Sequence, residues 1–150
     1  MALNFNQFAT EANTFINEYT EKLDIQGDTD KGGRILSSIL HGLRELIPVQ
    51  ESLQLIAQFP MFLKAIYVNG WSLKPKSLAR VKRMDEFIDL IREYNGITGD
   101  SDFPDDGLAE RYIQTTFIML KQYVSLGELE DIRTTLPKDL KPMVYQDLMF

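Results

Sequence analysis

The sequence predicts an all-α protein built from two similar halves, and three observations support this. Apolar residues recur every three or four positions along most of the chain, whereas the alternation typical of strands is missing. The 150 residues are 44% apolar and 25% charged, a balance typical of a globular protein that buries its own core. The second half repeats the apolar pattern of the first. We therefore expect a tandem repeat of two four-helix units, packed as one helical bundle.

The first unit, residues 1–71, is predicted to contain a long helix pair followed by two short helices. Its opening helix carries Phe5, Phe8 and Phe15 at helical spacing. Pro60 separates the two short helices, because proline suits a first helical turn, where its missing N–H and fixed φ cost nothing. The apolar stripe of the second long helix comprises Ile35, Leu36, Ile39, Leu40, Leu43, Leu46 and Ile47.

The second unit, residues 84–150, is predicted from its register with the first. A shift of 77 positions aligns polar, apolar and proline residues, and a shift of 79 aligns the opening helices, so the second unit has a shorter loop. Because each unit alone has a marginal core, we expect the units to pack as one compact body. The aligned pairs include Arg34 with Arg111, Leu43 with Leu120, Glu51 with Glu128, Pro60 with Pro137, and, at the second shift, Phe8 with Phe87.

Local signals set the helix boundaries of the second unit. Residues 104–106, a proline followed by two aspartates, favour the start of its long helix, since carboxylates favour the positive end of the helix dipole. Ser125 and Glu128 have the spacing of a capping box, in which the glutamate also reaches back to the serine amide. Pro142 should end or kink the last helix after about one turn.

Charge divides the chain into three segments. The net charge is −6 and the isoelectric point about 4.8, which argues against nucleic-acid binding, because that requires many lysines and arginines. Residues 1–71 carry five basic and eight acidic residues, residues 72–83 five basic and none acidic, and residues 84–150 six basic and 14 acidic. We interpret residues 72–83 as a linker that neutralises the two acidic halves; the alternative is a patch for an anionic partner. This candidate patch comprises Trp71, whose ring we expect between the halves, and Lys74, Lys76, Arg80, Lys82 and Arg83.

Composition also excludes several classes of protein. Without cysteine, the chain has no disulfide, thiolate nucleophile, zinc finger or iron–sulfur cluster. The amino terminus is not typical of a secretory signal, and no apolar run approaches the roughly 20 residues that cross a bilayer. We expect a cytoplasmic protein with no membrane insertion.

Three spaced motifs resemble the bacterial domain of unknown function 2267 family. The first is Tyr67-Val68-Asn69-Gly70-Trp71 followed by a basic link and Arg83-Met84-Asp85-Glu86-Phe87-Ile88. The others are Ala57-Gln58-Phe59-Pro60 and the stretch from Val124 through Arg133 followed by Leu136-Pro137. The resemblance implies an all-helical tandem repeat in a bacterial protein, but it implies little about activity, and no catalytic residue can be carried over from it. Gly32-Gly33 and Pro142 depart from the family pattern and affect only helix ends.

Candidate chemistry is sparse, and we assign no catalytic residue, metal site or cofactor. His41 has no second histidine or cysteine to complete a relay, so we place it at the surface or boundary. Residues 28–33 and 100–106 are rich in aspartate, but their spacing does not fit a calcium loop, so we interpret them as helix caps and solvated loops. A carboxylate enzyme would have to use Glu51 and Glu128, for which helix capping is the better explanation.

These observations favour a noncatalytic protein-interaction or regulatory module with an unidentified protein partner. The alternative is a binder of small molecules or lipids, with an apolar cleft between the halves near Trp71. Self-association stays open, because helical repeats can leave apolar end faces.

Overall fold

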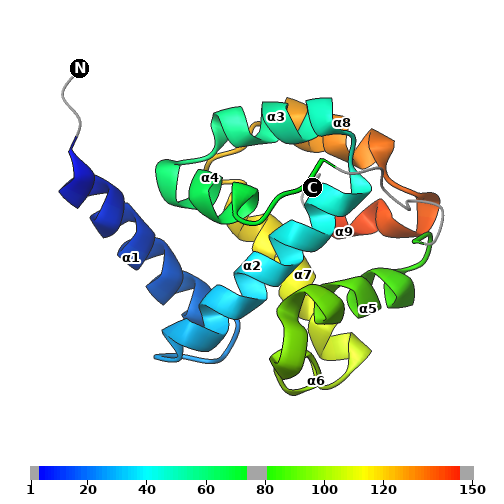
Figure 1. Cartoon of the computed structure of the whole chain (residues 1–150), viewed down its shortest axis with the longest axis horizontal. Coiled ribbons are helices and arrows are strands. Elements are labelled where there is room, and N and C mark those ends of the chain that lie inside the picture. Colours follow the sequence, from blue (N-terminus) through cyan, green and yellow to red (C-terminus); the bar gives the residue numbers. More distant parts are fainter. Residues whose placement is uncertain (1–3, 74–80, 146–150) are drawn as a thin grey trace.

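Every regular element in the described part of the chain is a helix, as predicted. The computed structural model describes residues 4–73 and 81–145, and these form α-helices and short 3-10 helices without a strand (Figure 1). No helix among them is both long enough and apolar enough to span a bilayer. The α-helices are α1 (Phe5–Lys22), α2 (Thr29–Leu46), α3 (Val49–Gln58), α4 (Met61–Val68), α5 (Met84–Asn95), α6 (Gly99–Asp102), α7 (Asp106–Leu120), α8 (Leu126–Thr135) and α9 (Pro142–Tyr145), and the 3-10 helices are Gly96–Thr98 and Lys138–Leu140.

The two long central helices, α2 and α7, begin at aspartate caps. The Asp28 side chain accepts a hydrogen bond from the Lys31 amide at 3.1 Å, and the Asp105 side chain accepts one from the Leu108 amide at 2.8 Å. Each cap satisfies one of the amides that the first helical turn leaves unpaired. The capping interpretation is therefore confirmed for Asp28 and for Asp105.

Helices of the two halves are interleaved. Figure 1 shows α2 and α7 crossing at the centre, α1 and α5 on their flanks, and α3 beside α8. Helix α2 contacts α1, α4, α5 and α7, and its contact with α5 is the most extensive between any two described helices. The first helix of the second half thus packs on the long helix of the first.

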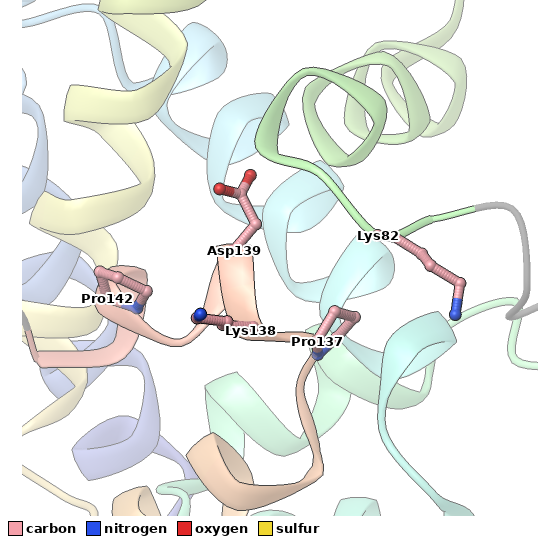
Figure 2. A pocket seen from close by; sticks show the side chains of 5 residues that line it. All are labelled: Lys82, Pro137, Lys138, Asp139 and Pro142. Atoms are coloured by element: carbon pink, nitrogen blue, oxygen red, sulfur yellow. The ribbon is translucent and has the colours of Figure 1, made fainter.

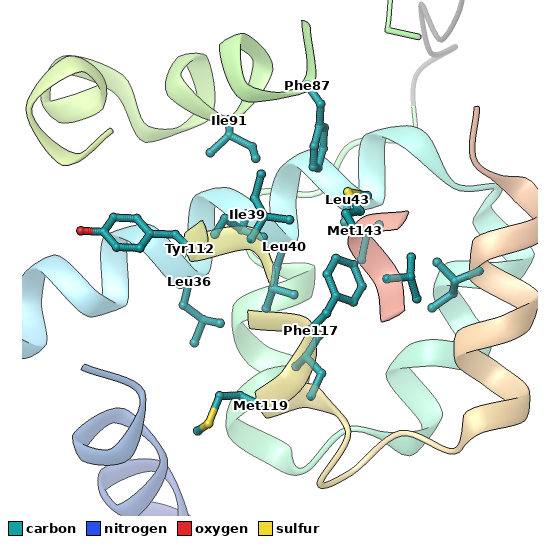
Figure 3. Packing of buried hydrophobic residues seen from close by; sticks show 14 of the residues in the cluster. Leu36, Ile39, Leu40, Leu43, Phe87, Ile91, Tyr112, Phe117, Met119 and Met143 are labelled. Carbon is teal, nitrogen blue, oxygen red and sulfur yellow. The ribbon is translucent and has the colours of Figure 1, made fainter. Parts of the chain in front are cut away.

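One cluster of buried apolar side chains draws on both halves. Leu40 and Leu43 of α2 belong to the same buried cluster as Phe117 of α7 and Met143 of α9 (Figure 3). Close approach of α5 to α2 depends on Gly42, because a Cβ there would lie 3.0 Å from Ile91 and 3.2 Å from Phe87. Burial of this surface is the main favourable term in folding.

The end of the chain departs from a simple pair of helices. Pro137 precedes the 3-10 helix Lys138–Leu140 rather than an α-helix, and Pro142 begins the short helix α9. Proline lacks an N–H and fixes φ, so it starts helices and does not continue them. The predicted break at Pro142 is confirmed.

The segment between α5 and α7 also differs from the prediction. Where we expected a loop, the chain forms the 3-10 helix Gly96–Thr98 and helix α6.

Candidate carboxylate site between α3 and α8

Two glutamates occupy the third position of neighbouring helices. Glu51 lies in the first turn of α3 and Glu128 in the first turn of α8, and these two helices run side by side (Figure 1). Acidic residues suit a first helical turn because the helix dipole is positive there. Local sequence preference therefore places both carboxylates, and helix packing then brings them together.

The Glu128 carboxylate does not cap the start of α8, although the sequence predicted this. Ser125 Oγ accepts from the Glu128 amide at 3.1 Å, which confirms half of the predicted capping box. The Ser125 amide, however, donates to Oε1 of Gln58 at 2.7 Å, so the predicted return bond from Glu128 is wrong. A side chain at the end of α3 has replaced it, because the two helices pack closely enough for a tertiary contact. At α3, Pro48 is the N-cap and makes no side-chain capping bond.

Three carboxylates converge at this place. One oxygen from each of Glu51, Glu128 and Asp131 lies within 4.8 Å of the other two. Glu128 is only 5% exposed, Glu51 is half-buried and Asp131 is exposed. Among the described residues, neither Oε2 of Glu51 nor Oε2 of Glu128 has a hydrogen-bond partner, although both atoms are buried. The cluster is therefore closed on one side and open to solvent at Asp131.

The environment of Glu128 opposes its ionisation. Burial raises the pKa of the Glu128 carboxyl to about 8, and a hydrogen bond with Glu51 and repulsion from Glu51 and Asp131 act in the same direction. Two neighbouring carboxylates can share one proton, and a cluster of three can bind a cation. Proton exchange and cation binding are thus the two kinds of chemistry that this arrangement supports.

A second buried carboxylate belongs to an ion pair across the two halves. Asp102 is fully buried and accepts from Arg34 Nε at 2.8 Å and Arg34 Nη2 at 3.0 Å, while Asn95 Nδ2 donates to it at 3.0 Å. The pKa of Asp102 lies below its ordinary value, because these donors outweigh the effect of burial, the largest single influence. The interpretation of residues 100–106 as caps and solvated loop is therefore wrong for Asp102, which sits in helix α6 and joins the halves.

His41 lies at the boundary of the fold, as predicted, and has a structural contact. Its Nε2 lies 2.8 Å from the carbonyl oxygen of Ile66, and its ring meets Tyr94 edge to face. Burial lowers the pKa of His41, and the charge of Arg44 lowers it further, against the bond to Ile66. Arg44 itself is buried and donates Nη1 to the carbonyls of Tyr67 and Asn69 at the end of α4.

Only part of the candidate basic patch falls within the described residues. Lys74, Lys76 and Arg80 lie outside them. Lys82 is exposed, and Arg83, the N-cap of α5, pairs its guanidinium with Asp85 in the first turn of that helix at 3.0 Å. Trp71 is partly buried and rests edge-on against Tyr67 at a ring separation of 5.9 Å. These contacts are compatible with both interpretations of residues 72–83, an internal linker and a patch for an anionic partner.

A surface hollow of about 530 Å³ lies where the linker enters the second half. The residues that line it are Lys82, Pro137, Lys138, Asp139 and Pro142 (Figure 2). Asp139 also accepts from the Met84 amide at 2.8 Å, so its carboxylate fixes the start of α5. With two lysines, an aspartate and two prolines, this hollow differs in chemistry from the apolar cleft expected near Trp71.

Sequence reasoning aligned Glu51 with Glu128 but did not expect them to touch. The available signal was the shift of 77 positions that aligns the two glutamates, because residues that align in two similar segments can meet where those segments pack together. Asp131 follows Glu128 by about one helical turn, so its place on the same face of α8 was also predictable. Gln58 carried no such signal, since its bond to Ser125 depends on the packing of α3 against α8.

Comparison with known proteins agrees with the resemblance seen in the motifs. Residues 12–143 match the family model described as "Uncharacterized conserved protein (DUF2267)". No curated protein matches the chain. Because the family model covers most of the sequence, the chain belongs to the DUF2267 family.

Proposed function

We propose that this protein is a noncatalytic helical module that binds another protein through the outer surface of α3 and α8. The observation that carries this proposal is the pair of exposed leucines on these adjacent helices, Leu53 at 56% and Leu126 at 51% exposure. Where exposed apolar residues form a patch with polar residues around it, the patch can mark a docking surface. Exposed Glu130 and Asp131 add negative charge, so the partner we expect is a segment with apolar and basic residues.

We further propose that the module is a tandem repeat of two helical units. Helices α3 and α8 each contain ten residues, and both their first and last residues are 77 positions apart. The caps Asp28 and Asp105 are also 77 positions apart, and each accepts from the amide three residues on. The main difference is at the end, where α4 corresponds to a 3-10 helix followed by α9.

A noncatalytic role fits the tasks of the polar side chains. His41 contacts the carbonyl of Ile66, Arg44 holds the carbonyls at the end of α4, and Arg34 holds Asp102. These three side chains, which could otherwise serve as acid, base or anion binder, are thus engaged in fold contacts. We place this activity in the cytoplasm, and the chain, which has no cysteine, needs no disulfide there.

The proposal is tested by comparing wild-type protein with a Leu53→Lys/Leu126→Lys variant in quantitative affinity purification from a bacterial lysate. The matched control is Ile97→Lys, which changes a fully exposed apolar residue in the 3-10 helix after α5. All three proteins should show the same far-UV circular dichroism, because surface substitutions rarely change stability by more than about 0.5 kcal/mol. A partner protein should be enriched by wild type and by the Ile97 variant, and lost from the double variant.

Direct binding then identifies the surface. A recovered partner, purified and titrated against both variants, should bind the double variant at least about tenfold more weakly, since buried apolar anchors dominate interface energy. Equal recovery by all three proteins would contradict α3 and α8 as the docking surface. Recovery of the chain itself, together with a doubled mass in solution, would replace the partner with a second copy.

A further inference from the structure

The carboxylate cluster contains buried polar atoms that the described part of the fold does not satisfy. Glu128 is more than nine-tenths buried, with 5% of its surface exposed. Neither Oε2 of Glu128 nor Oε2 of Glu51 has a hydrogen-bond partner among the described residues. A buried oxygen without a partner costs free energy, which a bound ligand can recover. We propose that Glu51, Glu128 and Asp131 bind one divalent cation of the oxygen-preferring class, Ca²⁺, Mg²⁺ or Mn²⁺, between α3 and α8.

The spacing of the three oxygens fits such an ion. All three lie within 4.8 Å of one another. Calcium takes oxygen ligands at about 2.3–2.6 Å, so two ligands on opposite sides of it are up to about 4.6–5.2 Å apart. The separations therefore lie within the limit that a shared calcium sets, and the smaller Mg²⁺ and Mn²⁺ require the three oxygens to lie closer together.

The ligand set and its position favour the same class of ion. A site made only of carboxylates suits Ca²⁺, Mg²⁺ and Mn²⁺ rather than metals that select thiolate or imidazole. Three ionised carboxylates repel one another, and a dication offsets two of their charges. Because Asp131 is exposed, water can complete the coordination from the solvent side.

A cation held here would link the two halves of the chain. Glu51 belongs to α3, whereas Glu128 and Asp131 belong to α8, and 77 residues separate the two glutamates. The unfolded chain does not hold these groups together, so binding would stabilise the folded state alone. Protons should compete for the same oxygens, because a carboxylate must be ionised to bind a metal.

Thermal unfolding of the full chain tests the proposal. Protein stripped with EDTA and desalted is titrated with CaCl₂, MgCl₂ or MnCl₂ at pH 8 and constant ionic strength. We expect Tm to rise by roughly 3–6 °C when the cation reaches about ten times its Kd. Electron paramagnetic resonance of Mn²⁺ should count one bound ion per chain.

Matched variants separate this site from general attraction to an acidic protein. Glu128→Gln should abolish the rise in Tm, and Asp131→Asn should weaken binding at least about tenfold. Glu130→Gln removes the same charge from an exposed position on the same helix and should behave as wild type. If Glu128→Gln does not fold, the exposed Asp131 variant carries the test.

Two results would overturn the proposal. One is no rise in Tm with any of the three cations, which would leave the cluster as carboxyls that share a proton. The other is an equal rise in wild type, Glu128→Gln and Asp131→Asn, which would show binding elsewhere on the acidic surface. Neither result bears on the docking surface, because that proposal is tested at Leu53 and Leu126.

Discussion

At the residue scale, one buried hydrogen bond between the halves, Tyr19 with Thr116, has a fixed direction. Thr116 donates its hydroxyl to the Tyr112 carbonyl at 2.7 Å, so its oxygen must accept from the Tyr19 hydroxyl, also at 2.7 Å. Both residues are buried. Thr116 is thus a donor within its own helix and an acceptor for the other half.

The two partners of this bond should respond differently to removal. Tyr19→Phe deletes a donor and leaves Thr116 bonded to Tyr112, so we expect a loss of about 0.5–1.5 kcal/mol. Thr116→Val strands the buried Tyr19 hydroxyl, which should cost about 1–3 kcal/mol. Urea unfolding at pH 7 measures both. A Tyr19→Phe variant that loses as much as Thr116→Val would contradict the assigned direction.

His41 should make stability depend on pH. Its pKa in the folded protein lies below the ordinary value, so between these two values the unfolded chain binds more protons. The His41 contribution is therefore present above about pH 6.5, its unfolded pKa, and is lost as pH falls through the folded pKa.

The test compares wild type with His41→Gln, whose amide can still donate to the Ile66 carbonyl. Free energies of unfolding from urea titrations at pH 5, 6, 7 and 8 should fall more steeply toward low pH in wild type than in the variant. Parallel curves for the two proteins would show that His41 does not titrate differently in the folded and unfolded states.

At the element scale, helix α2 carries two adjacent glycines with opposite surroundings. A Cβ at Gly33 would meet nothing within 4 Å, whereas a Cβ at Gly32 would lie 2.5 Å from Cγ2 of the buried Thr20 in α1. The family pattern led us to expect stronger helix formers at both positions. The structure explains Gly32 through the close approach of α1 and offers no packing reason for Gly33.

Alanine substitution should therefore have opposite signs at neighbouring positions. Gly33→Ala should stabilise the protein by about 0.5–1 kcal/mol, because alanine loses less backbone entropy in a helix. Gly32→Ala should destabilise it, since overpacking costs typically about 1–3 kcal/mol and exceeds that gain. Thermal unfolding monitored by circular dichroism measures both changes. A rise in Tm for both variants would mean that Thr20 moves aside easily.

Helix ends were predictable from sequence where one local contact decides them. The starts of α7 at Asp105 and α8 at Ser125, and the break at Pro142, follow from caps and from the missing proline amide. Helix α6 was not predictable in this way, because burial of Asp102 against Arg34 depends on a residue 68 positions away.

The carboxylate site shows the same division. The sequence alignment at a shift of 77 positions already paired Glu51 with Glu128. Their convergence depends on the packing of α3 against α8, and the release of the Glu128 carboxylate depends on Gln58 reaching the Ser125 amide. Sequence periodicity describes one helix at a time. It therefore favoured a capping role for the Glu128 carboxylate over a contact with Glu51 on another helix.

At the scale of the whole molecule, polar bonds between the halves are distributed over the fold. They reinforce an apolar core to which α2, α5, α7 and α9 all contribute. Such interleaving gives neither half a complete core of its own, and small cores are marginal. The bonds between the halves include Tyr19 with Thr116, Arg34 with Asp102, Glu45 with Tyr94, and Gln58 with Ser125.

Unfolding should accordingly be one cooperative transition. Substitutions in the core of either half should lower its midpoint to a similar extent. Leu43 of α2 and Leu120 of α7 are both fully buried, and replacing either with alanine should cost about 2–5 kcal/mol. Leu53→Ala, at an exposed position, should cost less than about 0.5 kcal/mol and serves as the control. Guanidinium unfolding followed by Trp71 fluorescence reports on the first half, and far-UV circular dichroism reports on all helices.

If the halves are one body, both probes must give the same midpoint in every variant, because loss of Leu120 removes core contacts for α2 as well. A Leu120→Ala variant in which the fluorescence midpoint stays at its wild-type value while the dichroism midpoint falls would show two independent units instead.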